Sequence, residues 1–157
     1  MVKRSAGVVL YRRRKRGAEV LLVHPGGPFW AKRDAGVWSI PKGEPEPDED
    51  LLTRAKIELK EETGLTAAGP FHELEPVRQT TKTVYAWAAP GGALPACGPS
   101  NTFTMEWPAG SGKMREFPEV DRTAWVDLAT ARKKLIKGQV GLIDQLESLL
   151  KRGVLVE

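Results

Sequence analysis

Short apolar runs typical of β-strands alternate with segments of helical spacing along a chain of only 157 residues. A length near ~150 residues is that of one ordinary globular domain, so we expect one hydrophobic core and a single domain over residues 1–157. Strands and helices that intermix in so short a chain favour an α/β or α+β layered domain. A large multidomain protein is excluded.

The expected strands are short and are separated by turns that contain Gly or Pro. Residues 8–10 and 20–23 flank a basic turn with a glycine, as adjacent strands do. Residues 37–40 are expected to form a brief strand, which Pro41 ends because it lacks a backbone N–H. Further strands are expected at Val77 and over residues 83–88, 102–107 and 124–126, with a loop over 90–99 and a hairpin turn over 108–112.

Two regions have helical spacing. From Asp50 to Thr63 the apolar positions recur with the helical period, acidic residues precede the first turn, and Gly64 is placed to end the helix. Residues 128–150 alternate apolar pairs with charged residues and predict two amphipathic helical pieces.

The segment 24–36 is rich in Gly and Pro yet contains Phe29 and Trp30, and it predicts a loop of the kind that often borders a functional site. The other aromatic and histidine residues show no spacing that indicates chemistry. We expect core or rim positions for Trp30, Trp87, Trp107 and Trp125, and ordinary structural or surface roles for His24 and His72.

The net charge of +4 and the sequence pI of 9.3 favour anionic ligands such as phosphates without requiring a nucleic acid. The basic residues 12–16 are interpreted as a solvated hairpin tip whose charges protect a sheet edge. A grip on RNA is the less favoured alternative.

Cys97 is the only cysteine, which excludes a disulfide within the chain and a metal site with several cysteines. No stretch approaches the ~18 apolar residues of a membrane span, and residues 6–10 are too short for a signal peptide. We therefore expect a cytoplasmic protein without a membrane partner. The serines show no nucleophile-elbow pattern, which disfavours acyl transfer, and a Walker loop is absent.

Glu58, Glu61 and Glu62 lie at spacings that place their carboxylates within one sector of the predicted helix. Like charges one turn apart destabilise a helix by a few tenths of a kcal/mol per pair, and a divalent cation would reverse that effect. Clustered carboxylates suit Mg²⁺, which shares its coordination sphere with substrate phosphates. A solvated acidic face is the alternative, but Glu62 follows the apolar positions Ala55 and Leu59 and should lie where helix meets core.

Residues 43–65 read GEPEPDEDLLTRAKIELKEETGL and resemble the 23-residue box of the Nudix hydrolase family, G-x5-E-x7-R-E-U-x-E-E-x-G-U, in which U is a bulky aliphatic residue. The matching positions are Gly43, Glu49, Glu58, Leu59, Glu61, Glu62, Gly64 and Leu65. The resemblance implies a Nudix-type α/β/α sandwich with a mixed β-sheet between helices. It also implies Mg²⁺-dependent hydrolysis of a phosphoanhydride bond, with Mn²⁺ as the alternative ion, in which these glutamates bind or position the metal.

One fixed position departs from the box, because Ile57 stands where the family has an arginine. Arg54 lies one helical turn before Glu58 and can reach the same face. We hypothesise that Arg54 replaces the missing cation and belongs to the catalytic group, whereas Lys56 points more toward the opposite side.

Residues 38–44, WSIPKGE, resemble the Trp-x-x-Pro-Lys-Gly segment of Nudix enzymes that split dinucleoside polyphosphates asymmetrically. By this resemblance Lys42 contacts the phosphate chain, and its backbone carbonyl meets a metal. Lys82 and Tyr85 are similar to a lysine-and-tyrosine strand of the same subgroup, in which the amine meets phosphate and the ring stacks on a base. Core packing is the alternative for Tyr85, and Lys32 and Arg33 are further candidate phosphate contacts.

Many Nudix members complete the metal site with an acid from outside the box, and the resemblance makes Glu119 the first candidate and Glu116 the second. The favoured function is a Mg²⁺-dependent pyrophosphohydrolase of nucleoside polyphosphates, with dinucleoside tetraphosphate as substrate. The alternatives are hydrolysis of oxidised nucleoside triphosphates or ADP-ribose, removal of pyrophosphate from RNA ends, or a nucleotide or RNA sensor that is slow because of Ile57.

Overall fold

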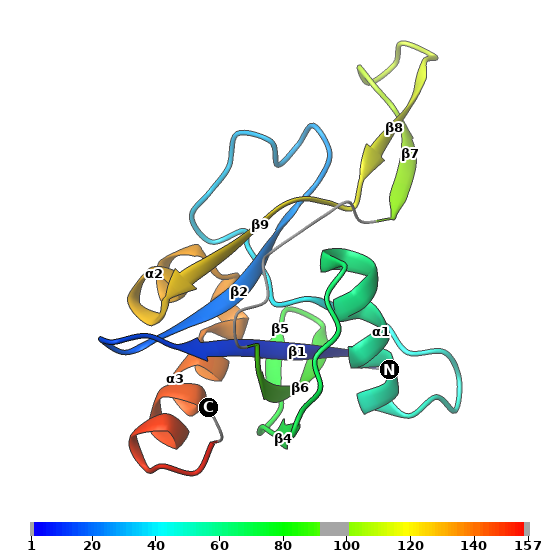
Figure 1. The fold of residues 1–157 in the computed structure, drawn as a ribbon. Coiled ribbons are helices and arrows are strands. Elements are labelled where there is room, and N and C mark those ends of the chain that lie inside the picture. Colours follow the sequence, from blue (N-terminus) through cyan, green and yellow to red (C-terminus); the bar gives the residue numbers. More distant parts are fainter. Residues whose placement is uncertain (1, 92–100, 156–157) are drawn as a thin grey trace.

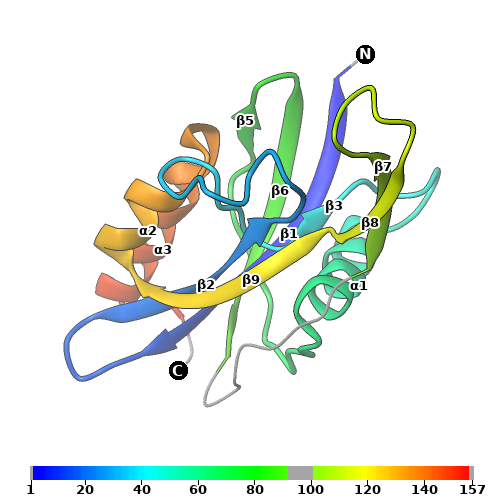
Figure 2. The same cartoon turned by 90° about the horizontal axis from the view of Figure 1, so that it is seen from above.

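A seven-stranded mixed sheet forms the centre of the fold in the computed structural model, which describes residues 2–91 and 101–155. Its main path runs β4-β6-β1-β2-β9, with β3 paired to β1 and β5 paired to β6. Helix α1 lies on one side of the sheet, and α2 and α3 lie on the other (Figures 1 and 2). The expected sandwich is therefore confirmed.

The strands of this sheet are β1 (Lys3–Arg13), β2 (Ala18–Pro25), β3 (Lys42–Gly43), β4 (His72–Glu73), β5 (Val77–Gln79), β6 (Lys82–Pro90) and β9 (Val120–Asp127). A separate hairpin is formed by β7 (Thr102–Glu106) and β8 (Met114–Pro118) and projects from the body (Figure 1). The helices are α1 (Leu51–Thr63), α2 (Leu128–Lys134), the 3-10 turn η1 (Lys137–Gln139) and α3 (Val140–Lys151).

The central strand β1 is buried on both faces, because its side chains alternate between the two layers. Ala6, Val8 and Leu10 pack into the core on the α1 side, whereas Val9 and Tyr11 belong to the core under α2 and α3. β1 is antiparallel to β2 and parallel to β6. A parallel pair needs a crossover between its strands, and the chain segment that contains α1 supplies it.

Helix α1 begins and ends as the sequence predicts. The side chain of Asp50 accepts a hydrogen bond from the backbone N–H of Thr53, and Gly64 has a φ of 77° and donates its N–H to the carbonyl of Lys60. A positive φ of this kind is adopted most readily by glycine. Ala55 and Leu59 are buried against the sheet, so the face that carries the three glutamates is fixed.

The strand expected over residues 37–40 is wrong. Trp38 makes an isolated bridge to Leu135 and Ser39 makes one to Val23, and the strand in this region is β3, which follows Pro41. Residues 37–40 pass from one neighbouring segment to another instead of running alongside a single strand, so no ladder of backbone hydrogen bonds forms. The short strand β4 and the strand β8 were not foreseen, although the hairpin turn over 108–112 is confirmed.

The other predicted elements are confirmed. The turn between β1 and β2 is the expected basic hairpin tip, and Arg12 and Arg14 both pair with Glu19 across it. Residues 128–151 form α2, η1 and α3 as expected. Residues 92–100, which contain most of the expected loop and Cys97, lie outside the described part of the chain. Among the described helices, none has the length and apolar character needed to cross a bilayer.

Candidate active site

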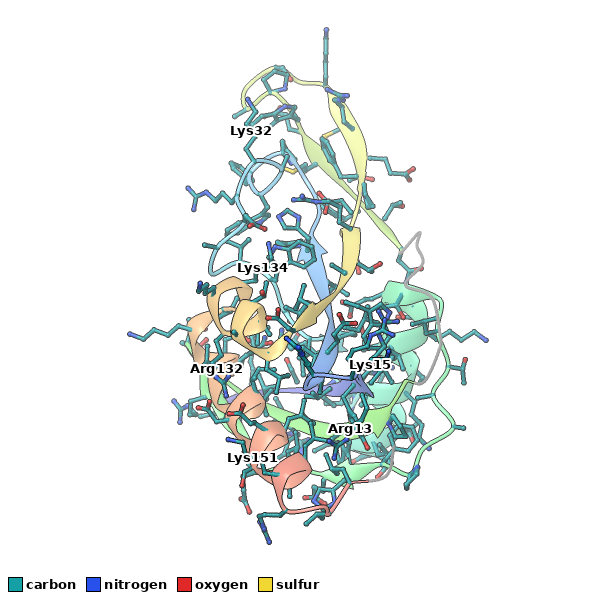
Figure 3. The ribbon with its side chains drawn as sticks, turned by 60° about the vertical axis from the view of Figure 1, so that its left-hand side comes forward. Arg13, Lys15, Lys32, Arg132, Lys134 and Lys151 are labelled. Carbon is teal, nitrogen blue, oxygen red and sulfur yellow. The ribbon has the colours of Figure 1, made fainter. Side chains whose placement is uncertain are left out.

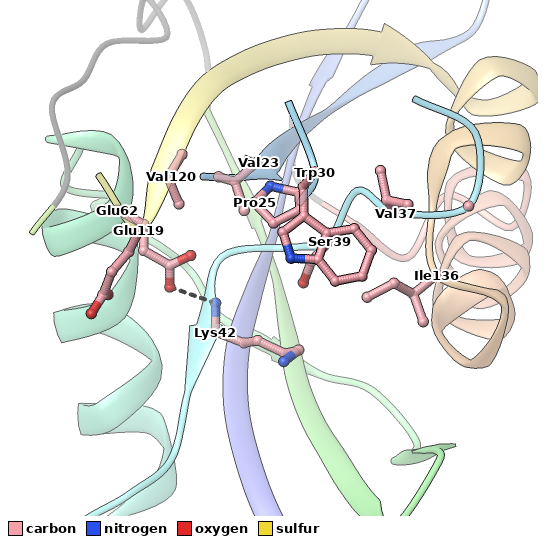
Figure 4. A pocket seen from close by; sticks show the side chains of 11 residues that line it. Val23, Pro25, Trp30, Val37, Ser39, Lys42, Glu62, Glu119, Val120 and Ile136 are labelled. Atoms are coloured by element: carbon pink, nitrogen blue, oxygen red, sulfur yellow. Dashed lines mark hydrogen bonds between the residues drawn. The ribbon is translucent and has the colours of Figure 1, made fainter. Parts of the chain in front are cut away.

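A pocket of about 290 Å³ lies between the C-terminal turns of α1, the beginning of β9 and the loop after β2 (Figure 4). Its two ends differ in chemistry. Glu62 and Glu119 form an acidic end beside Lys42, whereas Trp30, Val37 and Ile136 form an apolar end. A concave site that is apolar with a few convergent polar groups is the usual form of a small-molecule site.

Glu58 lies against the backbone of β3. A Cβ built on Gly43 would overlap the Glu58 carboxylate, so the glycine of the box is needed for close approach. Gly43 in turn pairs with Ala6 of the central strand. The pairing of Gly43 with the sheet therefore fixes where the Glu58 carboxylate lies against β3.

Glu62 is a partly buried carboxylate that lines the pocket. Its Oε2 accepts a hydrogen bond of 3.1 Å from the backbone N–H of Lys42, drawn as a dashed line in Figure 4. Burial, followed by the nearby charge of Glu58, raises the pKa of Glu62 well above the ordinary range of a carboxyl group. The environment of Glu62 therefore favours its neutral form, and a bound cation would oppose this shift.

Glu119 completes the acidic end from a different part of the chain, immediately before β9. Burial raises the pKa of Glu119, and the charges of Glu58 and Glu61 add to the effect, so the carboxylates of α1 and Glu119 are electrostatic neighbours. Glu116 lies on β8 opposite Thr104, is exposed and does not line the pocket. The structure thus brings the first candidate, but not the second, to the site.

Arg54 reaches Glu58 as hypothesised. Its Nη1 donates to Glu58 Oε2 at 2.9 Å, while its Nε and Nη2 donate to the two oxygens of Glu49 at 2.7 and 3.1 Å. These hydrogen bonds raise the pKa of Arg54 above its usual range. A bidentate contact fixes the plane of the guanidinium. Lys56 instead lies over the ring of Phe71 at 4.6 Å, which agrees with its expected direction.

The acidic end fits a divalent cation by its chemistry. Within residues 2–91 and 101–155, no three acidic, histidine or cysteine side chains are already arranged around one point as metal ligands. Glu58 is turned toward Arg54 and Glu62 toward the Lys42 N–H. The negative charge of Glu58 raises the pKa of both Glu62 and Glu119, and clustered carboxylate oxygens of this kind are donors suited to Mg²⁺.

The predicted substrate contacts do not all reach the pocket. Lys42 lines it, and burial together with the charge of Lys82 lowers the pKa of Lys42. Lys82 is thus close to Lys42 but does not line the pocket, nor does Tyr85. Because their positions on β6 differ by an odd number, Lys82 and Tyr85 lie on opposite faces of the strand.

Sequence analysis missed the apolar end of the pocket. Trp30 was expected only at a core or rim position, and Val37 and Ile136 were not singled out. The feature of the sequence that pointed to this end of the pocket was the Gly- and Pro-rich composition of the segment 24–36, which predicted a loop that borders a functional site. Periodicity could not show that Ile136, which is distant in sequence, meets this loop.

The loop after β2 is tied to the sheet by His24, which is fully buried as a structural histidine would be. Its Nδ1 lies 2.7 Å from Asp121 Oδ1, and its Nε2 lies 2.6 Å from the carbonyl oxygen of Arg33. The guanidinium of Arg33 lies over the Trp30 ring at 5.7 Å. Lys32 lies at the opposite end of the molecule from Arg13 and Lys151, so the basic side chains are spread widely (Figure 3).

Three solved structures resemble this fold over most of their length. The Caenorhabditis elegans Ap4A hydrolase binary complex has a TM-score of 0.69 at 22% identity and covers 96% of this chain and 99% of its own. The NUDIX domain of Shewanella oneidensis NrtR, complexed with ADP ribose, has a TM-score of 0.68 at 19% identity, with coverages of 96% and 89%. The MutT protein of Methanosarcina mazei has a TM-score of 0.58 at 22% identity, with 95% of each chain covered.

The search of curated proteins found no match. The model of the NUDIX domain family, however, matches residues 1–146, which is nearly the whole chain. The box on α1, its supporting glycine and the mixed sheet agree with that match. The chain therefore belongs to the NUDIX domain family and is a hydrolase that acts on phosphoanhydride bonds.

Proposed function

We propose that this protein is a Mg²⁺-dependent pyrophosphohydrolase of nucleoside polyphosphates, with dinucleoside tetraphosphate as its substrate. The observation that supports the proposal is the acidic end of the pocket. Glu119 from the start of β9 and the glutamates of α1 are electrostatic neighbours beside Lys42, a half-buried lysine. This combination suits a metal-bound phosphate chain, because anionic oxygens need both a cation and fixed positive charge.

The proposed reaction is the addition of water to one phosphorus atom. The water oxygen forms a bond to phosphorus, the bridging P–O bond breaks, and the leaving phosphate takes the bonding electron pair. Glu58 receives the proton of the water, and Arg54 is a positioning residue that holds the Glu58 carboxylate. General base catalysis of this kind contributes about 10²–10⁴-fold.

Glu58, Glu61, Glu62 and Glu119 are the proposed ligands, together with the backbone carbonyl of Lys42. Bound Mg²⁺ supplies neutralisation of phosphate charge and lowers the pKa of a coordinated water. The amine of Lys42 is proposed to contact the phosphate chain, and Lys82 extends this positive charge along β6. Lysine suits this role as a compact point charge with three donors.

Two features favour dinucleoside tetraphosphate. The segment 38–44 matches the Trp-x-x-Pro-Lys-Gly pattern, and the C. elegans Ap4A hydrolase has the same fold over 96% of this chain. Hydrolysis of ADP-ribose is the second candidate, because the NrtR NUDIX domain of similar fold is complexed with ADP ribose. Oxidised nucleoside triphosphates and 5′-triphosphorylated RNA ends are the remaining candidate substrates and are included in the same test.

The test is product analysis after the pure protein and Mg²⁺ are incubated with dinucleoside tetraphosphate, ADP-ribose, oxidised triphosphates and 5′-triphosphorylated RNA. We expect the fastest turnover with dinucleoside tetraphosphate, and unequal products. Reaction in heavy-oxygen water identifies the phosphorus that is attacked.

Glu58→Gln must lower the turnover by at least about 100-fold, and Met114→Ala, which changes an exposed side chain on β8 outside the pocket, must not. Undiminished turnover in Glu58→Gln would indicate a contaminating enzyme. Tight nucleotide binding without turnover in the native protein would instead support the sensor alternative.

A further inference from the structure

The proposed chemistry uses the acidic end of the pocket and leaves the apolar end without a role. Trp30 enters this end from the loop after β2, Val37 from the end of that loop, and Ile136 from the segment that precedes η1 (Figure 4). The indole is 39% exposed and faces the cavity, in contrast to the buried Trp38 nearby. An indole that is exposed inside a cavity leaves apolar ring surface available for contact with a ligand.

We infer that Trp30, supported by Val37 and Ile136, is the platform on which the nucleobase of the substrate stacks. This inference rests on the proposed function, because it assumes that the phosphates lie at the acidic end. Base–aromatic stacking suits such a surface, since every base has a π-face that an indole can cover. The platform and the acids line one continuous pocket, so a single nucleotide can occupy both ends.

Several contacts restrain the loop that carries Trp30. The Arg33 guanidinium lies over the Trp30 ring at 5.7 Å, and the carbonyl of Arg33 is 2.6 Å from His24 Nε2. The adjacent Phe29 packs edge-on against Trp107, which follows β7, with 5.5 Å between the ring centres. A restrained aromatic side chain loses less conformational entropy on binding.

The resemblance to dinucleoside polyphosphate hydrolases assigned base stacking to Tyr85, but the pocket gives that role to another residue. Tyr85 lies on β6, paired in register with Ala6 of β1, and it does not line the pocket. Trp30 does line it and has ring surface available. The stacking residue is therefore contributed by a loop outside the family box.

The platform should accept different bases with similar affinity. Ser39 is the polar side chain nearest this end among the described lining residues, and its hydroxyl already donates to the Ile40 carbonyl at 2.6 Å and accepts from Gln139 at 3.0 Å. Strong discrimination between bases requires side-chain hydrogen bonds that a wrong base leaves unpaired. Stacking alone is tolerant of base identity.

The test compares the binding of two nucleotides that differ in the base with the binding of a third ligand that has no base. Calorimetry with Mg²⁺ measures the affinity of the slowly hydrolysed analogue β,γ-methylene ATP, its guanine counterpart, and tripolyphosphate, which has no base. We expect Trp30→Leu to weaken both nucleotides about tenfold or more and by similar factors, and to leave tripolyphosphate unchanged. Trp30→Phe, which keeps an aromatic ring, should lose less.

Met114→Ala serves as the matched control, because Met114 is a large exposed apolar side chain away from the pocket. Equal loss of all three ligands in Trp30→Leu, or no loss of the nucleotides, would overturn the platform. Either result could occur while the native protein still hydrolyses its substrate, so failure of the platform is distinguishable from failure of the proposed function. Thermal unfolding of each variant identifies any that fold poorly.

Discussion

The acidic side chains at and beside the pocket come mainly from one continuous stretch of chain, whereas the apolar end of the pocket is assembled from segments about a hundred residues apart. Glu58, Glu61 and Glu62 share one helix, and only Glu119 joins them from elsewhere. Trp30 and Ile136 meet only because the chain is folded. The difference implies that the chemistry is encoded locally and that the substrate end can vary without disturbing it.

The largest expected effect is the loss of turnover in Glu58→Gln. We expect kcat to fall by about 10²–10⁴-fold, because the amide cannot accept the proton, while KM changes little. Steady-state kinetics on the proposed substrate measure both quantities. If Glu58→Gln raised KM and kept kcat, Glu58 would have a role in binding only, and the assignment of the chemistry to the acidic residues would be wrong.

Gly43→Ala tests the support of that end by the sheet. The added Cβ would overlap the Glu58 carboxylate, and we expect displacement of that group and a loss of kcat of about 100-fold. Gly141→Ala on α3 is the matched control, because its Cβ meets only Val77 Cγ1, at 3.5 Å. The control should keep full activity and gain about 0.5–1 kcal/mol in the free energy of unfolding. Equal activity of the two variants would show that the close approach of Gly43 to the Glu58 carboxylate is not needed for turnover.

Arg54→Ala should lower kcat about tenfold, because Glu58 then loses the guanidinium that orients it. The same substitution at Lys56, which contacts Phe71 instead, should have little effect and serves as the control. Ile57→Arg should add little in the native background, since Arg54 already fills the role. If Arg54→Ala left turnover unchanged while Ile57→Arg raised it strongly, compensation by Arg54 would be wrong.

The smallest expected effect concerns protons at the acidic end. The raised pKa values of Glu62 and Glu119 mean that the metal-free folded protein keeps protons that the unfolded chain has released. Its free energy of unfolding should therefore fall as the pH rises above the ordinary carboxylate range. Mg²⁺ must displace these protons, so its affinity should rise with pH, by at most about tenfold per unit for each proton released.

Calorimetry in buffers of different ionisation enthalpy measures the protons released when Mg²⁺ binds. Glu62→Gln should reduce that number, whereas Glu116→Gln on the exposed hairpin should not change it. Mg²⁺ binding that is independent of pH would show that the acidic end is already ionised.

Some parts of the fold were predictable because their signals are local. The ends of α1 follow from Asp50 and Gly64, and the antiparallel pairing of β1 with β2 follows from two apolar runs around a basic turn. The strand expected over residues 37–40 was wrong for the opposite reason. Ser39 and Trp38 make single bridges to two different neighbours, Val23 and Leu135, and single bridges do not make a strand.

The same division holds within the site. The contact of Arg54 with Glu58 was predictable, because residues one turn apart on a helix are neighbours. The absence of Tyr85 from the lining and the presence of Trp30 were not, since both depend on how β6 and the loop after β2 are placed around the pocket.

The amino-acid sequence by itself determined the family, the acidic helix and the contact of Arg54 with Glu58, because spacing along a single helix converts directly into geometry. Tertiary structure alone decided that Glu119 rather than Glu116 joins the acids, and that a loop tryptophan faces them across the pocket. Contacts between distant segments depend on the packing of the whole sheet and its two helical layers, which no local pattern records.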